Sequence, residues 1–165
     1  MRTASVESRG DYSAYNVTKG GGVKSFFSTN LTEMTITEVM DNQAKREIFA
    51  AGRYQMIPST LSAGVNYLKL DKSLMFNSDV QDKLFNEYLI VVKRPAIINY
   101  LTGNGTAEKA VYDWAKEFAS AGVMKSEKLS GNRVAKGGES YYAGDGYNKA
   151  FLAPDAMIKS LRNSK

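Results

Sequence analysis

The residues best suited to chemistry in this chain are one carboxylate near its start and one polar turn further along. Glu7 is followed by Ser8 and a polar, glycine-containing segment, and a Gly-Arg-Tyr-Gln segment occupies positions 52–55. A glutamic acid kept protonated near neutral pH can protonate a glycosidic oxygen. Tyr and Gln side chains present hydroxyl and amide groups that complement the polar groups of amino sugars. We therefore predict Glu7 as a general acid, and Tyr54 and Gln55 as residues that line a glycan-binding groove.

The residue types missing from the sequence narrow the chemistry further. The chain contains no Cys and no His, which excludes disulfides, thiolate nucleophiles, Ser-His-Asp schemes and the usual zinc sites. Acid–base work therefore falls to Asp, Glu, Tyr or Lys. The glycine-rich segments lack the spacing of a phosphate-binding loop. We expect neither a metal nor a cofactor.

A second carboxylate would decide between glycosidase mechanisms. An inverting hydrolase places a base roughly 6.5–9.5 Å from the acid, and a retaining one places a nucleophile about 5–5.5 Å away. Glu38 already has a structural explanation as the capping-box partner of Thr35, and Asp11 has one in shaping the turn after Gly10. No spacing selects one residue from the four candidates, which are Asp11, Glu33, Glu38 and Asp41.

Length, composition and charge bound the class of protein. The 165 residues fit one domain, and a hydrophobic content of 43% is enough for a core. The net charge of +5 suits an anionic polymer such as nucleic acid, teichoic acid or peptidoglycan, although small domains are often mildly basic for no functional reason. No apolar run approaches the roughly 18 residues of a membrane span. The first residues lack the apolar region of a signal peptide.

Capping signals and apolar spacing predict a predominantly α-helical α+β fold with a small β or irregular segment near the N-terminus. Residues 2–9 are expected to form a short helix, and residues 10–31 a loop with a small hairpin that turns at 20–22. Residues 122–150 are expected to be irregular. Five longer helices are predicted: from a capping box at Thr35 and Glu38 to about Arg46; from Pro58; from a second capping box at Ser78 and Gln81 to a break at Pro95; from a cap at Thr106; and from Pro154.

The apolar positions of these helices predict what they bury. The helix after Ser78 is expected to bury one stripe, formed by Val80, Leu84, Tyr88 and Val91. Trp114 lies among Ala and Phe residues and is expected in the core. Tyrosines gather instead in the glycine-rich segments, where they could stack on sugar rings or simply anchor loops. These tyrosines are Tyr12, Tyr15, Tyr141, Tyr142 and Tyr147.

The segments 6–12 (VESRGDY) and 49–60 (FAAGRYQMIPST) resemble the lysozyme-like superfamily, and most of all the phage lambda-type endolysins and related lytic transglycosylases. The resemblance continues through 78–84, 114–119 and 140–148. It implies a lysozyme-like fold, Glu7 as the catalytic acid, and a cleft lined by Tyr54 and Gln55. We add Tyr147 and Asn148 as substrate-binding candidates. Family members usually carry a longer helix before the glutamate, so one interpretation is a single catalytic domain, residues 1–165, cut from a larger protein.

The resemblance also implies a function, cleavage of the β-1,4 bond between MurNAc and GlcNAc in peptidoglycan. In lambda-type enzymes the C6 hydroxyl of the substrate attacks and a 1,6-anhydro sugar forms, so one acid–base residue is sufficient. A two-carboxylate muramidase and a catalytically silent peptidoglycan-binding domain remain alternatives. A nucleic-acid-binding domain is weakest, because no helix carries a basic stripe.

Several expectations about the setting follow from this function. We expect a monomer that acts in the periplasm or cell wall of a bacterial target. Phage lysis or a secretion machine would deliver it. An immunity or inhibitor protein is a further candidate partner.

Overall fold

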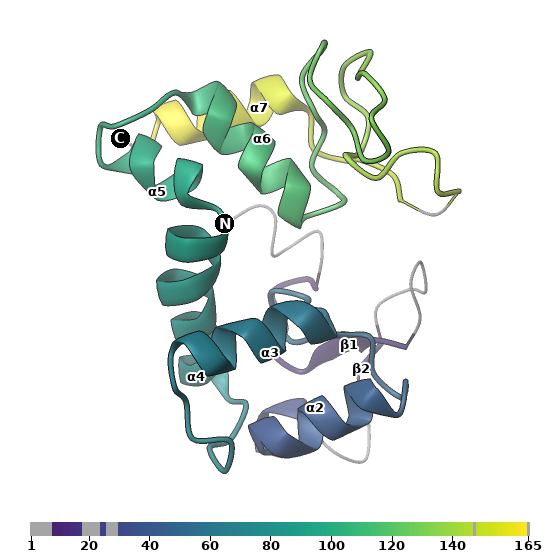
Figure 1. The fold of residues 1–165 in the computed structure, drawn as a ribbon, viewed down its shortest axis with the longest axis vertical. Helices are drawn as coiled ribbons and strands as arrows, with labels where there is room; N and C mark the ends of the chain where they lie inside the picture. Colours follow the sequence, from purple (N-terminus) through teal and green to yellow (C-terminus); the bar gives the residue numbers. More distant parts are fainter. Residues whose placement is uncertain (1–7, 18–23, 26–29, 147, 165) are drawn as a thin grey trace. The chain divides into compact units, whose positions relative to one another are not determined.

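A computed structural model describes residues 8–17, 24–25, 30–146 and 148–164 (Figure 1). The described chain is rich in α-helix and carries a small antiparallel sheet, which confirms the predicted α+β class at this level. Its contacts divide it into two compact units, 1–89 and 90–165. Each unit is described by itself, and the single-domain prediction stays a prediction. No helix in these described ranges is both long and apolar enough to cross a bilayer.

A three-stranded sheet in the first unit has the order β2-β1-β3. Strand β1 (Ala14–Asn16) pairs antiparallel with β2 (Lys24–Ser25) and with β3 (Ala50–Ala51). The predicted hairpin is thus confirmed in its strand pairing, whereas its expected turn at 20–22 lies outside the described residues. Most of the helix predicted at 2–9 also lies outside them. Within the described part, Arg9 and Gly10 form a turn with positive φ angles of 57° and 79°.

The first predicted capping box is confirmed. Helix α2 (Ile36–Ala44) begins after Thr35, whose hydroxyl accepts a hydrogen bond from the Glu38 N–H at 3.2 Å. The Glu38 carboxylate in turn accepts from the Thr35 N–H at 2.6 Å. These two bonds satisfy N–H groups that a helix start leaves without partners. A 3-10 turn, η1 (Leu31–Glu33), precedes the helix.

Helix α3 (Pro58–Tyr67) begins at its proline, as predicted, and buries Leu61 and Val65. It approaches the helix η2 (Leu84–Lys93) closely at Gly64. A Cβ at that position would come within 2.9 Å of side-chain atoms of both Leu84 and Tyr88. The contact therefore requires a residue without a side chain.

The second capping box is a wrong prediction. Helix α4 (Ser78–Lys83) begins one residue earlier than predicted, because the side chain of Asn77 accepts from the Val80 N–H at 3.0 Å. Gln81, assigned to N3 of that box, is instead buried inside the unit at 1% exposure.

The predicted stripe after Ser78 is also partly wrong. Leu84 is buried, but Val91 is 44% exposed. The chain from Leu84 to Lys93 forms the π-helix η2, whose wider turn shifts the buried set to Leu84, Phe85 and Leu89. The break at Pro95 is confirmed, since the next helix starts at that proline.

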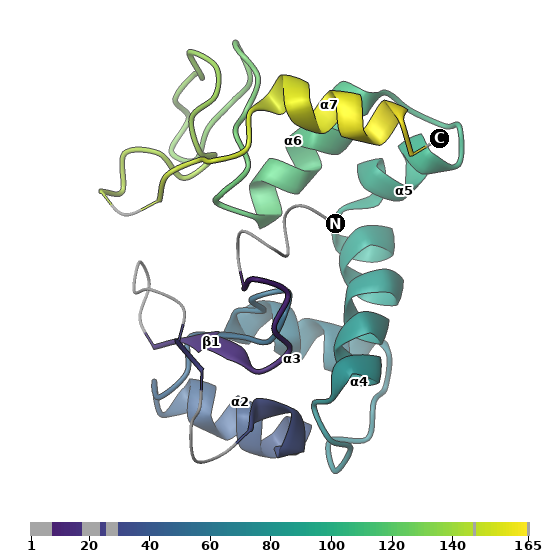
Figure 2. The ribbon, with the colours of Figure 1, turned by 180° about the vertical axis from the view of Figure 1, so that it is seen from behind.

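The second unit holds α5 (Pro95–Leu101), α6 (Ala107–Glu117) and α7 (Pro154–Arg162). The starts of α6 and α7 agree with the predictions, whereas α5 was not predicted as a helix. Its core joins side chains of all three helices: Tyr100, Ala107, Ala110, Val111 and Ile158. The predicted irregular segment runs from α6 to α7 (Figures 1 and 2). Isolated bridges such as Gly122 to Ser140 hold it. Trp114 is half-buried rather than central to the core, and its ring packs against Phe118.

Candidate active site

The two motifs that the sequence singled out meet in the first unit. The Ser8 hydroxyl donates a hydrogen bond of 2.7 Å to the backbone carbonyl of Arg53, 45 residues further along the chain. Ser8 is buried, with 2% of its surface exposed. The residue before it, Glu7, lies outside the described residues, so its role stays a prediction. The bond nevertheless joins the segment that carries Glu7 to the Gly-Arg-Tyr-Gln turn, residues 52–55.

Local backbone geometry explains why the turn begins with glycine. Ala51 and Met56 exchange two backbone hydrogen bonds, of 3.0 and 2.9 Å, which close the turn at its base. Gly52 has a φ of 75°, in the left-handed region. A Cβ at this position would overlap the side-chain oxygen of Gln81. Both the backbone angle and the close approach therefore select Gly52.

Gln81 fixes the turn from α4. Its side-chain oxygen accepts from the Arg53 N–H at 2.9 Å. Its amide nitrogen donates to the carbonyls of Tyr12 and Phe76 at 2.9 and 2.8 Å. One buried side chain thus satisfies three backbone groups from three segments. Sequence reasoning missed this role because two of the three partners, Arg53 and Tyr12, lie 28 and 69 residues away in the chain.

Tyr54 points into the unit. It is 9% exposed, and its ring stacks on Phe85 with centroids 4.1 Å apart and planes 11° from parallel. Its hydroxyl donates to the Asp82 carboxylate at 2.7 Å. Burial, and then the bond to Asp82, raise the pKa of this phenol well above its ordinary value. The hydroxyl is therefore neutral and already bonded, which supports a structural role, and its contact with substrate stays a prediction.

Tyr12 shares the same carboxylate. Its hydroxyl lies 2.9 and 3.0 Å from the two oxygens of Asp82. Burial is the main cause that raises the Tyr12 pKa, followed by the bond to Asp82. The Arg53 guanidinium lies over the Tyr12 ring, 5.0 Å from its centroid, and donates to the Gly10 carbonyl at 3.3 Å. Tyr12, Asp82, Tyr54 and Arg53 form what we call the Asp82 cluster.

Gln55 is half-buried and adopts a positive φ of 47°. Its amide nitrogen donates to the carbonyls of Gly52 at 2.8 Å and Ala14 at 3.3 Å. Its side-chain oxygen is shielded from solvent and has no hydrogen-bond partner within the described ranges. A buried acceptor without a donor is costly. The oxygen therefore has unused acceptor capacity, which a ligand hydroxyl or N–H reaches only if the side chain or its cover moves.

Two of the other carboxylate candidates, Asp11 and Glu38, accept hydrogen bonds from backbone N–H groups. Asp11 is exposed and accepts from the Ser13 N–H at 2.7 Å, as in an Asx turn. Glu38 closes the cap of α2, and its backbone bond with Thr35 is the main cause that lowers its pKa. Glu33 lies in η1, and Asp41 is exposed on α2. The structure thus confirms the capping role for Glu38 and the turn role for Asp11.

The remaining predicted binders lie mainly in the second unit. Tyr142 is half-buried and donates to the Lys116 carbonyl at 2.5 Å, and Tyr141 packs edge-on against it with centroids 5.2 Å apart. Asn148 bonds to Asp145 through its backbone N–H at 2.9 Å. Tyr147 lies outside the described residues. Tyr142 therefore anchors a loop, the second of the two roles considered for these tyrosines.

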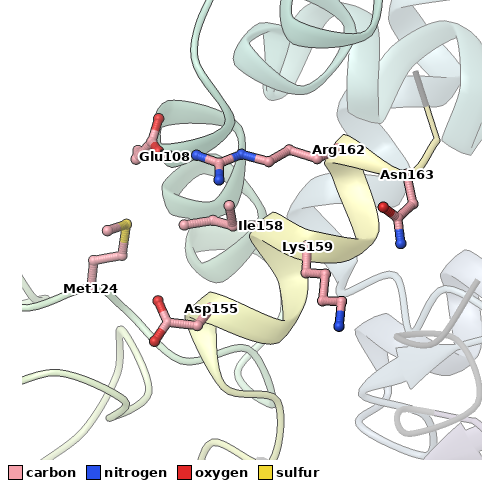
Figure 3. Close-up of a pocket in the computed structure, with 7 residues that line it drawn as sticks. All are labelled: Glu108, Met124, Asp155, Ile158, Lys159, Arg162 and Asn163. Carbon is pink, nitrogen blue, oxygen red and sulfur yellow. Dashed lines mark hydrogen bonds and ion pairs between the residues drawn. The ribbon is translucent and has the colours of Figure 1, made fainter.

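The second unit also holds a cavity of about 500 Å³ between α6, α7 and Met124 (Figure 3). Its floor is apolar, and its rim carries the Arg162–Glu108 ion pair at 3.3 Å. Among its lining residues that the structure describes, none has an aromatic ring that could stack on a sugar. The lining residues are Glu108, Met124, Asp155, Ile158, Lys159, Arg162 and Asn163. It contains none of the residues that the sequence singled out.

Among the described residues, no group of three or more Asp or Glu side chains is placed to hold a metal ion. Comparison with protein-family models, with curated proteins and with solved structures found no match to this chain.

Proposed function

We propose that this protein cleaves the glycan strand of peptidoglycan between MurNAc and GlcNAc, on a lysozyme-like fold. The observation that carries the proposal is the bond from Ser8 to the Arg53 carbonyl. It joins the start of the chain to the turn that offers Gln55, although nothing in the local sequence requires the two to meet. Glycoside cleavage needs a proton donor for the leaving oxygen, and Glu7 directly precedes Ser8 in the sequence.

Glu7 is the proton donor in this proposal. Glu7 directly precedes Ser8 in the sequence, and Ser8 is fixed by its buried hydrogen bond. Gln55 contributes the unpartnered oxygen as an acceptor for a sugar hydroxyl or acetamido N–H. A net charge of +5 favours approach to an anionic cell-wall polymer.

The mechanism we propose uses one carboxylate. Glu7 gives its proton to the leaving glycosidic oxygen, and the C6 hydroxyl of the same MurNAc attacks its anomeric carbon. Glu7 then takes the proton of that hydroxyl, and a 1,6-anhydro end results. Backbone N–H groups bind one oxygen of Asp11 and one of Glu38, which gives each carboxylate a structural role and so supports this choice.

Mass spectrometry of a peptidoglycan digest tests the proposal. We expect soluble muropeptides with anhydro ends to accumulate with time. Reducing ends would indicate a two-carboxylate muramidase. Co-sedimentation with peptidoglycan and no released fragments would indicate a binding domain, and a salt-sensitive shift of DNA mobility would favour the nucleic-acid alternative.

Replacement of the other carboxylates should leave most of the activity. We expect each of Asp11→Asn, Glu33→Gln, Glu38→Gln and Asp41→Asn to retain more than about a tenth of the rate, since general acid–base groups contribute about 100-fold or more. Glu38→Gln should change neither stability nor rate much, because Gln also accepts the N-cap hydrogen bond at N3 of a capping box. The measurement is muropeptide release per folded molecule. One variant as inactive as Glu7→Gln, together with reducing ends, would identify a second catalytic carboxylate.

Gln55→Ala should lower both stability and activity. Loss of its bonds to Gly52 and Ala14 should cost about 1–2 kcal/mol of unfolding free energy. Loss of a substrate contact should remove on the order of 1–3 kcal/mol of transition-state stabilisation. Denaturant unfolding and the rate per folded molecule measure the two effects.

Gln43→Ala provides the matched control for Gln55→Ala. Gln43 is buried and donates to the carbonyls of Phe49 and Met56, at 3.1 and 2.9 Å, so it also supports the base of the turn. Its loss should destabilise the protein at least as much, with a smaller fall in rate per folded molecule. Equal rates in the two variants would assign Gln55 a purely structural role.

A further inference from the structure

We propose that Asp82 is a positioning residue that holds the segment following Glu7 against the Gly-Arg-Tyr-Gln turn, through the hydroxyls of Tyr12 and Tyr54. The catalytic consequence of this inference rests on the proposed function. The holding of the segment does not, and it can be measured separately.

The geometry supports the proposal because Asp82 joins segments that are distant in the sequence. Tyr12 is 70 residues from Asp82 and lies shortly after Ser8, whereas Tyr54 is 28 residues from Asp82 and lies within the turn. Both hydroxyls donate to the same carboxylate, at distances of 2.7–3.0 Å. A single side chain on α4 therefore connects both halves of the candidate site.

The chemistry of the cluster favours a carboxylate. Tyr12 and Tyr54 both keep their protons, since burial and Asp82 raise the pKa of each phenol. Two O–H donors need an acceptor with several lone pairs, which an ionised carboxylate supplies. Both phenols contact Oδ1, and Tyr12 also contacts Oδ2, so Asn with its NH₂ group in place of Oδ2 would keep one acceptor for the two phenols and lose the second acceptor of Tyr12. The Arg53 guanidinium lies over the Tyr12 ring, and its positive charge lowers the pKa of both phenols, against the effect of Asp82.

Other contacts should keep the first unit folded when Asp82 is replaced, so a positioning role of Asp82 can be tested apart from folding. The backbone groups of Arg53, Tyr12 and Phe76 are already satisfied by Gln81, the neighbour of Asp82. Tyr54 also keeps its stacking on Phe85 without the carboxylate. Loss of the Asp82 charge should therefore leave the unit folded and loosen only the segments that the two phenols hold.

Hydrogen–deuterium exchange followed by mass spectrometry tests the first part. In Asp82→Asn, peptides that cover 8–16 and 50–56 should exchange about tenfold faster than in the native protein, because local opening becomes easier. Peptides from α6 should be unchanged. Asp79→Asn is the matched control, since it removes an exposed carboxylate from the same helix and should leave the exchange unaltered.

Steady-state kinetics tests the second part. We expect kcat of Asp82→Asn to fall about tenfold with KM near the native value, because the acid is misplaced while the groove persists. Tyr12→Phe should lower kcat by a smaller factor. The double variant Tyr12→Phe/Asp82→Asn should be no slower than Asp82→Asn alone, since both changes break the same contact.

The outcomes test three claims separately: that Asp82 holds the segment, that this affects kcat, and that the protein cleaves peptidoglycan. Unchanged exchange at 8–16 in Asp82→Asn and in Tyr12→Phe overturns the inference, whatever the activity. Faster exchange with an unaltered kcat overturns the positioning role and leaves a structural contact. If the native protein releases no muropeptides while the exchange rises as expected, the proposed function is wrong and the holding role of Asp82 stands. If Asp82→Asn does not fold, the Tyr12→Phe measurements decide.

Discussion

Glu7→Gln will reduce the rate of muropeptide release about 100-fold or more. Glutamine keeps the shape of the side chain and removes the proton that must reach the leaving oxygen. The chain has no His or Cys that could take over the transfer. Release is measured by turbidity loss of a peptidoglycan suspension and by mass spectrometry of the soluble products.

Glu47→Gln is the control for this experiment. Glu47 is an exposed carboxylate of the same unit, and its replacement changes the net charge equally. It should retain the native rate. A Glu7→Gln protein with near-native activity and a native circular dichroism spectrum would remove Glu7 from the mechanism. The proposed acid would then have to be sought among Asp11, Glu33 and Asp41.

Gln81→Met should destabilise the protein by about 3 kcal/mol. Methionine has a similar length and is apolar, so the change tests the hydrogen bonds more than the packing. It leaves the carbonyls of Tyr12 and Phe76 and the N–H of Arg53 without their side-chain partner in a buried environment. Urea unfolding followed by circular dichroism measures the loss.

Asp79→Ala on the same helix is the control for Gln81→Met, because Asp79 is exposed and its loss should change stability by only a few tenths of a kcal/mol. A Gln81→Met protein with the native unfolding midpoint would show that water replaces the three bonds at no net cost. The close approach of Gln81 to Gly52 would then reflect packing and contribute nothing through hydrogen bonds.

The helix starts could be predicted because the interactions that set them are local. Thr35 and Glu38 close the cap of α2 within four residues, and Thr106 caps α6 by the same short-range geometry. Pro58 and Pro154 fix the backbone angle of a first helical turn on their own.

The same local reasoning failed at α4. Two residues near its start can cap a helix, and the choice between Asn77 and Ser78 depends on whether Gln81 faces solvent or the interior. The buried stripe was missed for a related reason. The apolar spacing predicted an α-helical stripe, whereas residues 84–93 form the π-helix η2, whose Leu84 and Tyr88 lie against Gly64 of α3.

The sequence by itself determined the starts of α2, α3, α6 and α7 and the strand pair near the N-terminus. Its lack of His and Cys also limits acid–base chemistry to Asp, Glu, Tyr and Lys. Only the tertiary structure decided that Ser8 bonds to the Gly-Arg-Tyr-Gln turn, that Tyr54 points inward, and that Asp82 receives two phenols. The physical reason is separation along the chain. These partners are 28 to 70 residues apart, so no periodicity relates them. Their pairing follows from which polar groups burial leaves in need of a donor or an acceptor.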